Sequence, residues 1–260
     1  MMRPRVKTGV LIFALCLLAI SQLSAQDLKA TSPSSVVQQF YKLLRAKRYA
    51  EGFQFSIYSL ALEGLTADEL RDLEPDFERI AAALPEQVEV RGEEISDDRA
   101  TVFVKLPNEA QAQEVALIKL EGHWVIGDRE TQKVLKKQGR NYFFNERIRV
   151  SEAEVNEWLQ EILGAELIYF KAKQRYAELD ELIKLGGVSL QLNNGVVNGY
   201  RFAVTLNSEG KGFVVTAVPV TYGRTGRLSF YADQTLLIRA EDKSGQPASA
   251  TAVPYTSDKN

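Results

Sequence analysis

The chain has 260 residues, with 32 Lys and Arg against 34 Asp and Glu, one histidine and one cysteine. Basic residues do not outnumber acidic ones, as they usually do in a protein whose surface binds nucleic acid, so we expect no nucleic-acid partner. One histidine is too few for an ordinary zinc or copper site. It also leaves a single candidate base for a serine–histidine or cysteine–histidine catalytic system. We therefore expect no metal, no cofactor and no enzymatic activity, with catalysis by carboxylates alone as the open exception.

The first 25 residues have the pattern of a signal peptide. Three basic residues precede an uncharged apolar run, residues 10–20, and small residues then favour cleavage after Ala25. The run is shorter than the roughly 20 residues of a membrane-spanning helix, so retention as an N-terminal anchor is the alternative. Leu15 directly before Cys16 disfavours a lipoprotein site, which needs a small residue there.

Removing this segment leaves 29 basic and 34 acidic residues, a net charge of −5, and no cysteine. A chain of this length can bury a sufficient core without disulfides. We expect an exported protein, periplasmic or extracellular, whose membrane contact is limited to the N-terminal segment if that segment is retained.

Two helix starts follow. Ser32 is an N-cap candidate with Pro33 at the first helical position, before apolar residues at helical spacing. Thr66 and Glu69 have the spacing of a capping box, and Pro75 is expected to break or kink that second helix. Pro85 is expected to end the segment after it.

The apolar period then changes to two. Residues 86–96, 99–107, 114–121 and 123–128 alternate and are joined by turn residues, which predicts an antiparallel meander. Helices followed by a meander predict an α+β roll. We interpret the single histidine, His123, as the first residue of the last strand.

The segments SSVVQQFYKLLRAKRYAEGFQF and VALIKLEGHWVIGD resemble the ketosteroid isomerase and nuclear transport factor superfamily, over about residues 30–135. The resemblance implies a cone-shaped α+β roll, and members often carry a pocket between helix and sheet. Tyr41, Tyr58 and Trp124 are the candidates to line it. The alternative is that all three are ordinary core residues.

A third helix is expected from Ser151, because Ser151 and Glu154 again have capping-box spacing. Nine residues follow at alternating steps of three and four: Val155, Trp158, Ile162, Ala165, Tyr169, Ala172, Tyr176, Leu179 and Ile183. This stripe suits a coiled coil or a long helix laid across a sheet. Four alternating runs between residues 199 and 240 favour the sheet.

The order of elements from ELIYFKAKQRYAELDEL through GYRFAVTLN and AVPVTYGRTGRLSFYADQTLLIRA resembles the globular head of type IV pilin-like proteins, over about residues 156–240. The resemblance implies a helix whose first turns project beyond the head, which makes Val155 and Trp158 a candidate docking surface. Leu236 stands where a turn glycine is expected. The apolar N-terminal segment is separated from this head by another domain, which disfavours a filament subunit.

The sequence GRTGRL at residues 223–228 raises the question of a phosphate-binding loop. Such loops place their glycines between a strand and a helix. Here Gly223 and Gly226 precede an alternating strand, so we interpret the segment as a turn. Arg224 and Arg227 are then solvated or paired with Asp233.

Together these features predict an α+β protein with a signal peptide at 1–25, a ketosteroid isomerase-like roll at 30–147 and a pilin-like domain at 151–260. We expect the last domain to fold alone. The expected function is a non-enzymatic bacterial envelope protein that binds or scaffolds other envelope proteins. One alternative is a pocket in the N-terminal domain that either binds a small apolar ligand or serves a carboxylate-based isomerase or hydrolase. Another is a minor component of a secretion or pilus machine.

Overall fold

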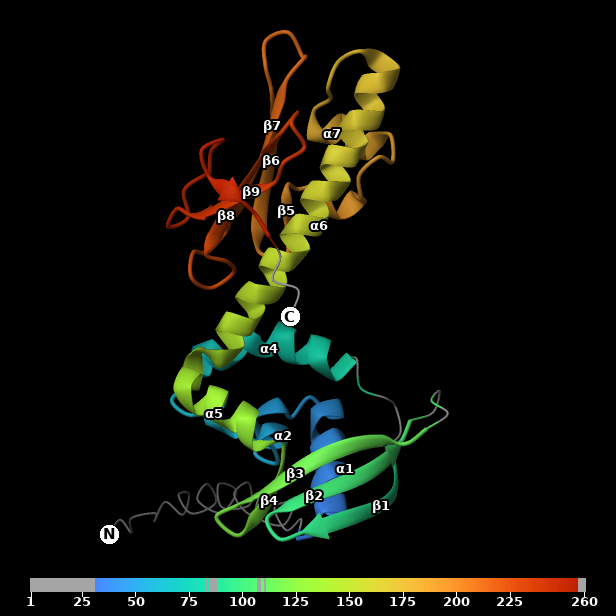
Figure 1. The fold of residues 1–260 in the computed structure, drawn as a ribbon, viewed down its shortest axis with the longest axis vertical. Coiled ribbons are helices and arrows are strands. Elements are labelled where there is room, and N and C mark those ends of the chain that lie inside the picture. The colour runs from blue at the N-terminus through green and yellow to red at the C-terminus, as the bar shows by residue number, and fades with distance from the viewer. Residues whose placement is uncertain (1–30, 83, 85–87, 107–108, 110, 257–260) are drawn as a thin grey trace, which may run out of the picture. The chain divides into compact units, whose positions relative to one another are not determined.

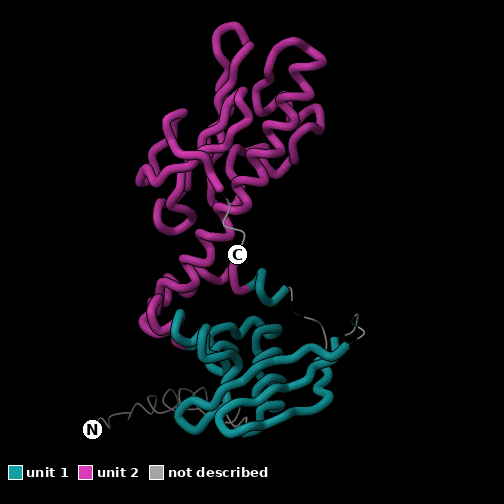
Figure 2. Tube along the Cα trace, viewed as in Figure 1, with its two compact units in different colours: residues 1–59, 78–134 teal, residues 60–77, 135–260 magenta. Residues whose placement is uncertain are grey.

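The structure is a computed structural model that describes residues 31–82, 84, 88–106, 109 and 111–256. The expected signal peptide and Pro85 lie outside these residues. The chain is an α+β protein with two antiparallel sheets (Figure 1). It divides into two compact units, Met1–Ser59 with Glu78–Val134 (unit 1) and Leu60–Phe77 with Leu135–Asn260 (unit 2) (Figure 2). Within the described ranges, no helix combines the length and the apolar character needed to cross a membrane.

The N-terminal helices are α1 (Pro33–Arg45), α2 (Tyr49–Phe53), α3 (Ser59–Leu62) and α4 (Ala67–Ala82). Both predicted helix starts are confirmed. The Ser32 hydroxyl accepts the backbone N–H of Ser35 at 3.2 Å, and Thr66 and Glu69 form a reciprocal capping box.

Of the predicted break or kink at Pro75, the break is wrong, because α4 continues through the proline. Proline removes one helical hydrogen bond, but Leu73 and Phe77 on either side are buried.

The first sheet is the predicted meander, with strands β1 (Glu89–Ser96), β2 (Arg99–Lys105), β3 (Gln113–Leu120) and β4 (His123–Ile126) in that order. β4 begins at His123, as predicted, and the histidine side chain is exposed. Helix α1 packs on this sheet (Figure 1) through a core that includes Val37, Leu43, Val102 and Leu117. Every second residue of β2 is buried, so these residues form part of the sheet face that packs on the core.

Unit 2 contains helices α6 (Tyr142–Lys173) and α7 (Leu179–Lys184), preceded by α5 (Arg129–Gln138) and the 3₁₀ turn Gly139–Asn141, with a further 3₁₀ turn at Leu190–Leu192. Its sheet has the order β10-β9-β8-β7-β6-β5 and is antiparallel throughout. The strands are β5 (Val196–Val197), β6 (Tyr200–Leu206), β7 (Phe213–Pro219), β8 (Leu228–Asp233), β9 (Arg239–Asp242) and β10 (Val253–Pro254).

The packing of α6 on this sheet confirms the helix-across-sheet interpretation. Val155, Leu159 and Ile162 are fully buried in one cluster with residues of the strands. Tyr200, Phe213 and Phe230 contribute the large side chains of the opposite side. Figure 1 shows the helix lying along the sheet in this unit.

The predicted start of this helix at Ser151 is wrong. The helix begins nine residues earlier, at Tyr142, and Ser151 is a buried interior residue. The segment before Ser151 has no helix breaker, and Phe143, Phe144 and Ile148 become buried there. Phe143 packs edge-on against Phe77 of α4, with ring centroids 5.0 Å apart. Tertiary packing therefore extends the helix beyond its local signal.

The predicted nine-position helical stripe is also shorter than expected. Helix α6 ends at Lys173, because Gln174 adopts a left-handed backbone with φ 59°. Tyr176, Leu179 and Ile183 reach the same core after the chain reverses, the last two from α7. The stripe residues lie in or against this core, except Ala172, which is exposed. They come from α6, from α7 and, for Tyr176, from the segment between these helices.

Residues Leu60–Phe77 belong to the same compact unit as the C-terminal residues. Arg147 of α6 pairs with Asp72 and Asp76 of α4, at 3.2 and 2.6 Å. A fragment that begins at Ser151 would remove these contacts and the first nine residues of α6. Independent folding of residues 151–260 stays a prediction.

Candidate functional site

The glycine-rich segment between β7 and β8 is a turn between two strands, as predicted. Gly223 has φ 73°, a conformation that glycine adopts without steric cost. Gly226 is needed for a different reason. A Cβ added there would overlap the ring and hydroxyl of Tyr200, which is fully buried and donates to the carbonyl of Leu228 at 2.9 Å.

Replacing Gly226 with alanine is expected to lower the free energy of unfolding by about 1–3 kcal/mol, because the buried Tyr200 ring must move. Gly164→Ala is the matched control, since a Cβ at Gly164 meets no atom within 4 Å. In a helix interior that change is expected to stabilise by about 0.5–1 kcal/mol. Chemical denaturation of both variants checks the prediction, and equal effects would contradict it.

The backbone amides of this turn hold an internal carboxylate. Glu152 of α6 accepts the N–H groups of Arg227 and Leu228 at 2.9 and 3.0 Å. The Arg227 side chain donates to Asn145 at 3.0 Å. These amides therefore serve the fold and are not presented to a phosphate.

Arg224 also has a partner that the sequence pattern did not reveal. It pairs with Glu69 of α4 at 3.0 Å, and its guanidinium lies 4.0 Å from the centroid of the buried Phe144 ring. The predicted pairing of these arginines with Asp233 is wrong, since Asp233 instead accepts hydrogen bonds from Tyr231 and Thr235. The partner is 155 residues away in the chain, so no local signal could reveal it.

Glu69 joins three segments of unit 2. Its carboxylate pairs with Arg140 at 2.6 Å as well as with Arg224, while it accepts the Thr66 N–H. Hydrogen bonds from Arg140, Thr66 and Arg224, in that order, lower the pKa of Glu69 to about 2. This cluster is structural, because its groups are satisfied by one another.

The three aromatic residues of the predicted N-terminal pocket are half-buried. Tyr41 and Tyr58 belong to one row of ring contacts that runs through Phe40 and Phe53, with neighbouring centroids 5.7 to 6.3 Å apart. Trp124 packs against the same sheet core as Tyr41. Rings therefore fill much of this region.

A surface recess of about 310 Å³ beside Tyr41 is lined by Gln38, Lys42, Arg45 and Val88. Burial raises the pKa of the Tyr41 phenol above its ordinary value. Among the described residues of unit 1, the buried polar side chains are Ser56 and Gln132, and neither is a carboxyl group. The arrangement offers no buried general base beside the recess. A ligand role for these aromatic residues stays a prediction.

The predicted docking surface at the start of the C-terminal helix needs correction. Val155 is fully buried in the unit 2 core, and Trp158 is partly buried against that core. The helix does not overhang the sheet at this point, since the sheet covers these turns. Val155 therefore cannot dock a partner.

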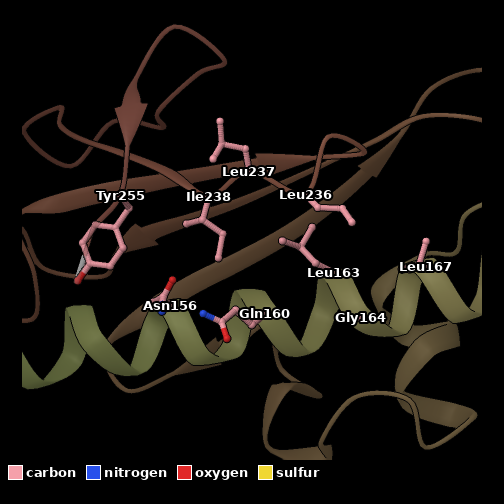
Figure 3. A pocket seen from close by; sticks show the side chains of 9 residues that line it. All are labelled: Asn156, Gln160, Leu163, Gly164, Leu167, Leu236, Leu237, Ile238 and Tyr255. Carbon is pink, nitrogen blue, oxygen red and sulfur yellow. The ribbon is translucent and has the colours of Figure 1, made fainter. Parts of the chain in front are cut away.

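A groove in unit 2 lies between α6 and the segment that joins β8 to β9 (Figure 3). It has a volume of about 460 Å³. One side is formed by Asn156, Gln160, Leu163, Gly164 and Leu167 of α6, and the other by Leu236, Leu237, Ile238 and Tyr255. Tyr255 is held there, because its N–H donates to the carbonyl of Ile238 at 2.9 Å and its ring packs against Phe230.

Leu236 is the unusual residue of this groove. It has φ 61°, and its side chain is 45% exposed. The other described non-glycine residues with such a backbone are all polar or charged, namely Lys47, Asp97, Glu121, Gln174, Asn198 and Ser244. Leu236 stands where the sequence pattern leads one to expect a turn glycine, and the backbone there is indeed left-handed.

Glu166 is a buried carboxyl group of unit 2 that was not among the predicted site residues. It is fully buried on α6, one oxygen accepts the Ala177 N–H at 3.0 Å, and the other has no hydrogen-bond partner. Burial raises its pKa to about 7. Glu166 lies between Ala165 and Tyr169 of the predicted apolar stripe, and this position was the indication in the sequence that its carboxyl group is buried.

Within the described residues, no group of three or more His, Cys, Asp or Glu side chains is placed to hold a metal ion. No family model and no curated protein matches the sequence. A solved structure described as an NTF2-like transpeptidase from Campylobacter jejuni is similar to 38% of this chain and 99% of its own, at 16% identity and a TM-score of 0.27. Because the identity and the TM-score are this low, the transpeptidase description applies to that solved structure and is not transferred to this chain.

Proposed function

We propose that this protein is an exported bacterial envelope protein that binds another protein in the groove between α6 and residues 236–238, without catalysing a reaction. The signal-peptide pattern of residues 1–25 supports export. The long helix laid on an antiparallel sheet supports the pilin-like interpretation of the C-terminal domain. The N-terminal helices and meander support a ketosteroid isomerase-like roll.

The observation that carries this proposal is the exposed, left-handed Leu236. A non-glycine residue in this conformation costs about 1–2 kcal/mol, and such strain concentrates at functional positions. Glycine would remove the cost, but it would also remove an apolar side chain from the groove wall. Leu237 and Leu167 are 39% and 38% exposed and extend the same apolar surface. A partner that covers these three leucines accounts for the retained strain.

The composition of the groove indicates what kind of segment fits it. Leucine, isoleucine and tyrosine side chains provide apolar contact, while Asn156 and Gln160 offer amide groups at one side. None of the nine lining residues is charged. This lining suits an apolar protein segment with some free backbone hydrogen-bonding groups better than an ionic ligand.

A pocket enzyme in the N-terminal domain is the less favoured function. The recess beside Tyr41 is lined by Lys42 and Arg45 and includes no acidic side chain. A carboxylate-based reaction needs an acidic group at the substrate. The groove in unit 2 is therefore the better-supported site.

Leu236→Gly is expected to leave the protein as stable as the wild type or up to about 1–2 kcal/mol more stable, while partner binding is lost. Binding is measured by placing a photo-crosslinking residue at Leu237 and recovering adducts from cells that express the full chain. Val220, which is 49% exposed and outside the groove lining, is the control position.

The expected result is a discrete adduct with a second protein from position 237, its absence from position 220, and its loss in the Leu236→Gly background. Equal adducts from both positions, or none from either, would overturn the proposal. An adduct with the mass of two copies of this chain that persists in an Ile168→Lys background would also contradict it, because the groove partner is then this protein.

A further inference from the structure

A second surface of α6 adjoins the groove and faces away from the sheet core. It surrounds a recess of about 470 Å³ whose walls include Gly164, Ile168 and Ala172 of α6 and Leu182 and Leu185 near α7. The three α6 residues are four positions apart, so they share one side of the helix. Ile168 and Leu185 are 72% and 65% exposed. We call this surface the Ile168 face.

The Ile168 face contains both a projecting side chain and a place that could receive one. Ile168 projects into solvent, and one helical turn before it the surface above Gly164 is open, with no atom within 4 Å of an added Cβ. A protruding aliphatic side chain beside an open glycine is the pattern of a self-complementary helix contact. Such a contact needs a second helix with the same features in the opposite direction.

Charge is distributed along the face in the same complementary way. Glu157 and Glu161 are exposed on the N-terminal side of Gly164, and Lys171 is exposed on the C-terminal side of Ile168. The helix dipole accounts for a lysine in the last turn, but its effect is confined to the terminal turns. The dipole does not act on Glu161, which lies well inside a helix that begins at Tyr142; within the chain, one oxygen of this carboxylate bonds to the backbone of Ser189.

We propose that the Ile168 face binds a second copy of this chain, with the two α6 helices antiparallel about a two-fold axis level with residue 166. In this register Ile168 lies opposite Gly164 of the second copy, and Glu161 lies opposite Lys171 of the second copy. The symmetry repeats each contact, so two isoleucines are buried and two ion pairs form. A parallel arrangement would place like charges together, which disfavours it.

The proposed ion pair cannot form within one chain. Glu161 and Lys171 are ten residues apart, about 15 Å along the helix axis at 1.5 Å per residue. One oxygen of Glu161 accepts the Ser189 N–H at 2.7 Å, and the carboxylate's other oxygen remains for a second donor. Reversal of both charges should therefore restore only an intermolecular contact.

Sedimentation equilibrium of the protein, expressed as the full-length chain, tests the proposal. We expect a monomer–dimer equilibrium whose Kd rises at least about tenfold in Glu161→Lys and in Lys171→Glu, because each places like charges opposite one another. The double variant Glu161→Lys/Lys171→Glu is expected to return to within about threefold of the wild type. Ile168→Lys is expected to be monomeric over the same concentrations.

Leu190→Lys is the matched control, since Leu190 is 76% exposed but is not part of the recess, and its Kd should remain within about twofold of the wild type. Thermal melts identify any variant that fails to fold, and the double variant then decides the result. A monomeric wild type, or a double variant no tighter than the single ones, would overturn the proposal. Leu236→Gly leaves this face intact, so failure of the groove proposal and failure of this one are separable.

Discussion

Replacing Ile162 with alanine is expected to lower the free energy of unfolding by about 2–5 kcal/mol. Ile162 is fully buried in the centre of the contact between α6 and the sheet. Alanine removes three side-chain carbons and leaves a cavity, because surrounding core residues relax only partly. Chemical denaturation followed by circular dichroism measures the change.

Ile168→Ala is the matched control for Ile162→Ala. The two isoleucines lie on the same helix, but Ile168 is 72% exposed, so in dilute protein its replacement should change stability by less than about 0.5 kcal/mol. Equal effects at the two positions would contradict the packing of α6 on the sheet. Loss of self-association in Ile162→Ala without a change in stability would instead support the coiled-coil interpretation.

The second expected result is a loss of stability as pH rises, caused by Glu166. Burial is the main cause of its raised pKa, and the charges of Glu178 and Glu181 add to it. The Ala177 N–H and Arg175 act in the opposite direction. The folded pKa of about 7 lies above the ordinary value of 4.5, so between these values the native state holds a proton that the unfolded state releases.

The free energy of unfolding is therefore expected to fall by about 3 kcal/mol as the pH rises from about 4.5 through about 7. Glu166→Gln should remove this decline, because a neutral amide can still accept the Ala177 N–H without a buried charge. The variant should be the more stable protein above pH 7. Urea denaturation at a series of pH values measures both curves.

Glu157→Gln is the control for this prediction, since Glu157 is an exposed glutamate on the same helix. It should retain the wild-type pH dependence. Glu69 affects stability in a different pH range. Its pKa is lowered, so its contribution to stability is lost as the pH falls from 4.5 toward about 2. A wild-type curve that is flat between pH 5 and 7 would contradict the assignment to Glu166.

Local signals were sufficient where a few neighbouring residues satisfy one another. The caps at Ser32 and at Thr66 with Glu69 form as predicted, because each pairs groups three residues apart. The meander of unit 1 follows its alternating pattern, since alternate side chains must face one core. The turn at Gly223 is likewise local, because its backbone requires a left-handed residue.

Features that depend on distant residues were not predictable in this way. Helix α6 begins at Tyr142, because Phe143 and Arg147 find partners on α4 about 70 residues earlier. The stripe beyond Lys173 has unbroken helical spacing, yet the chain reverses there and returns Ile183 to the same core. Spacing identifies apolar residues, but it cannot say which helix presents them.

The sequence alone therefore determined the α+β class, the meander of unit 1 and the turn at Gly223, because each depends on periodicity or on adjacent residues. Only the tertiary structure placed Glu69 between Arg140 and Arg224, and only it formed the groove at Leu236. Burial of Glu166 and of Val155 was also decided at this level. Exposure and charge pairing depend on which distant segments pack together, and that information is not contained in any single window of the chain.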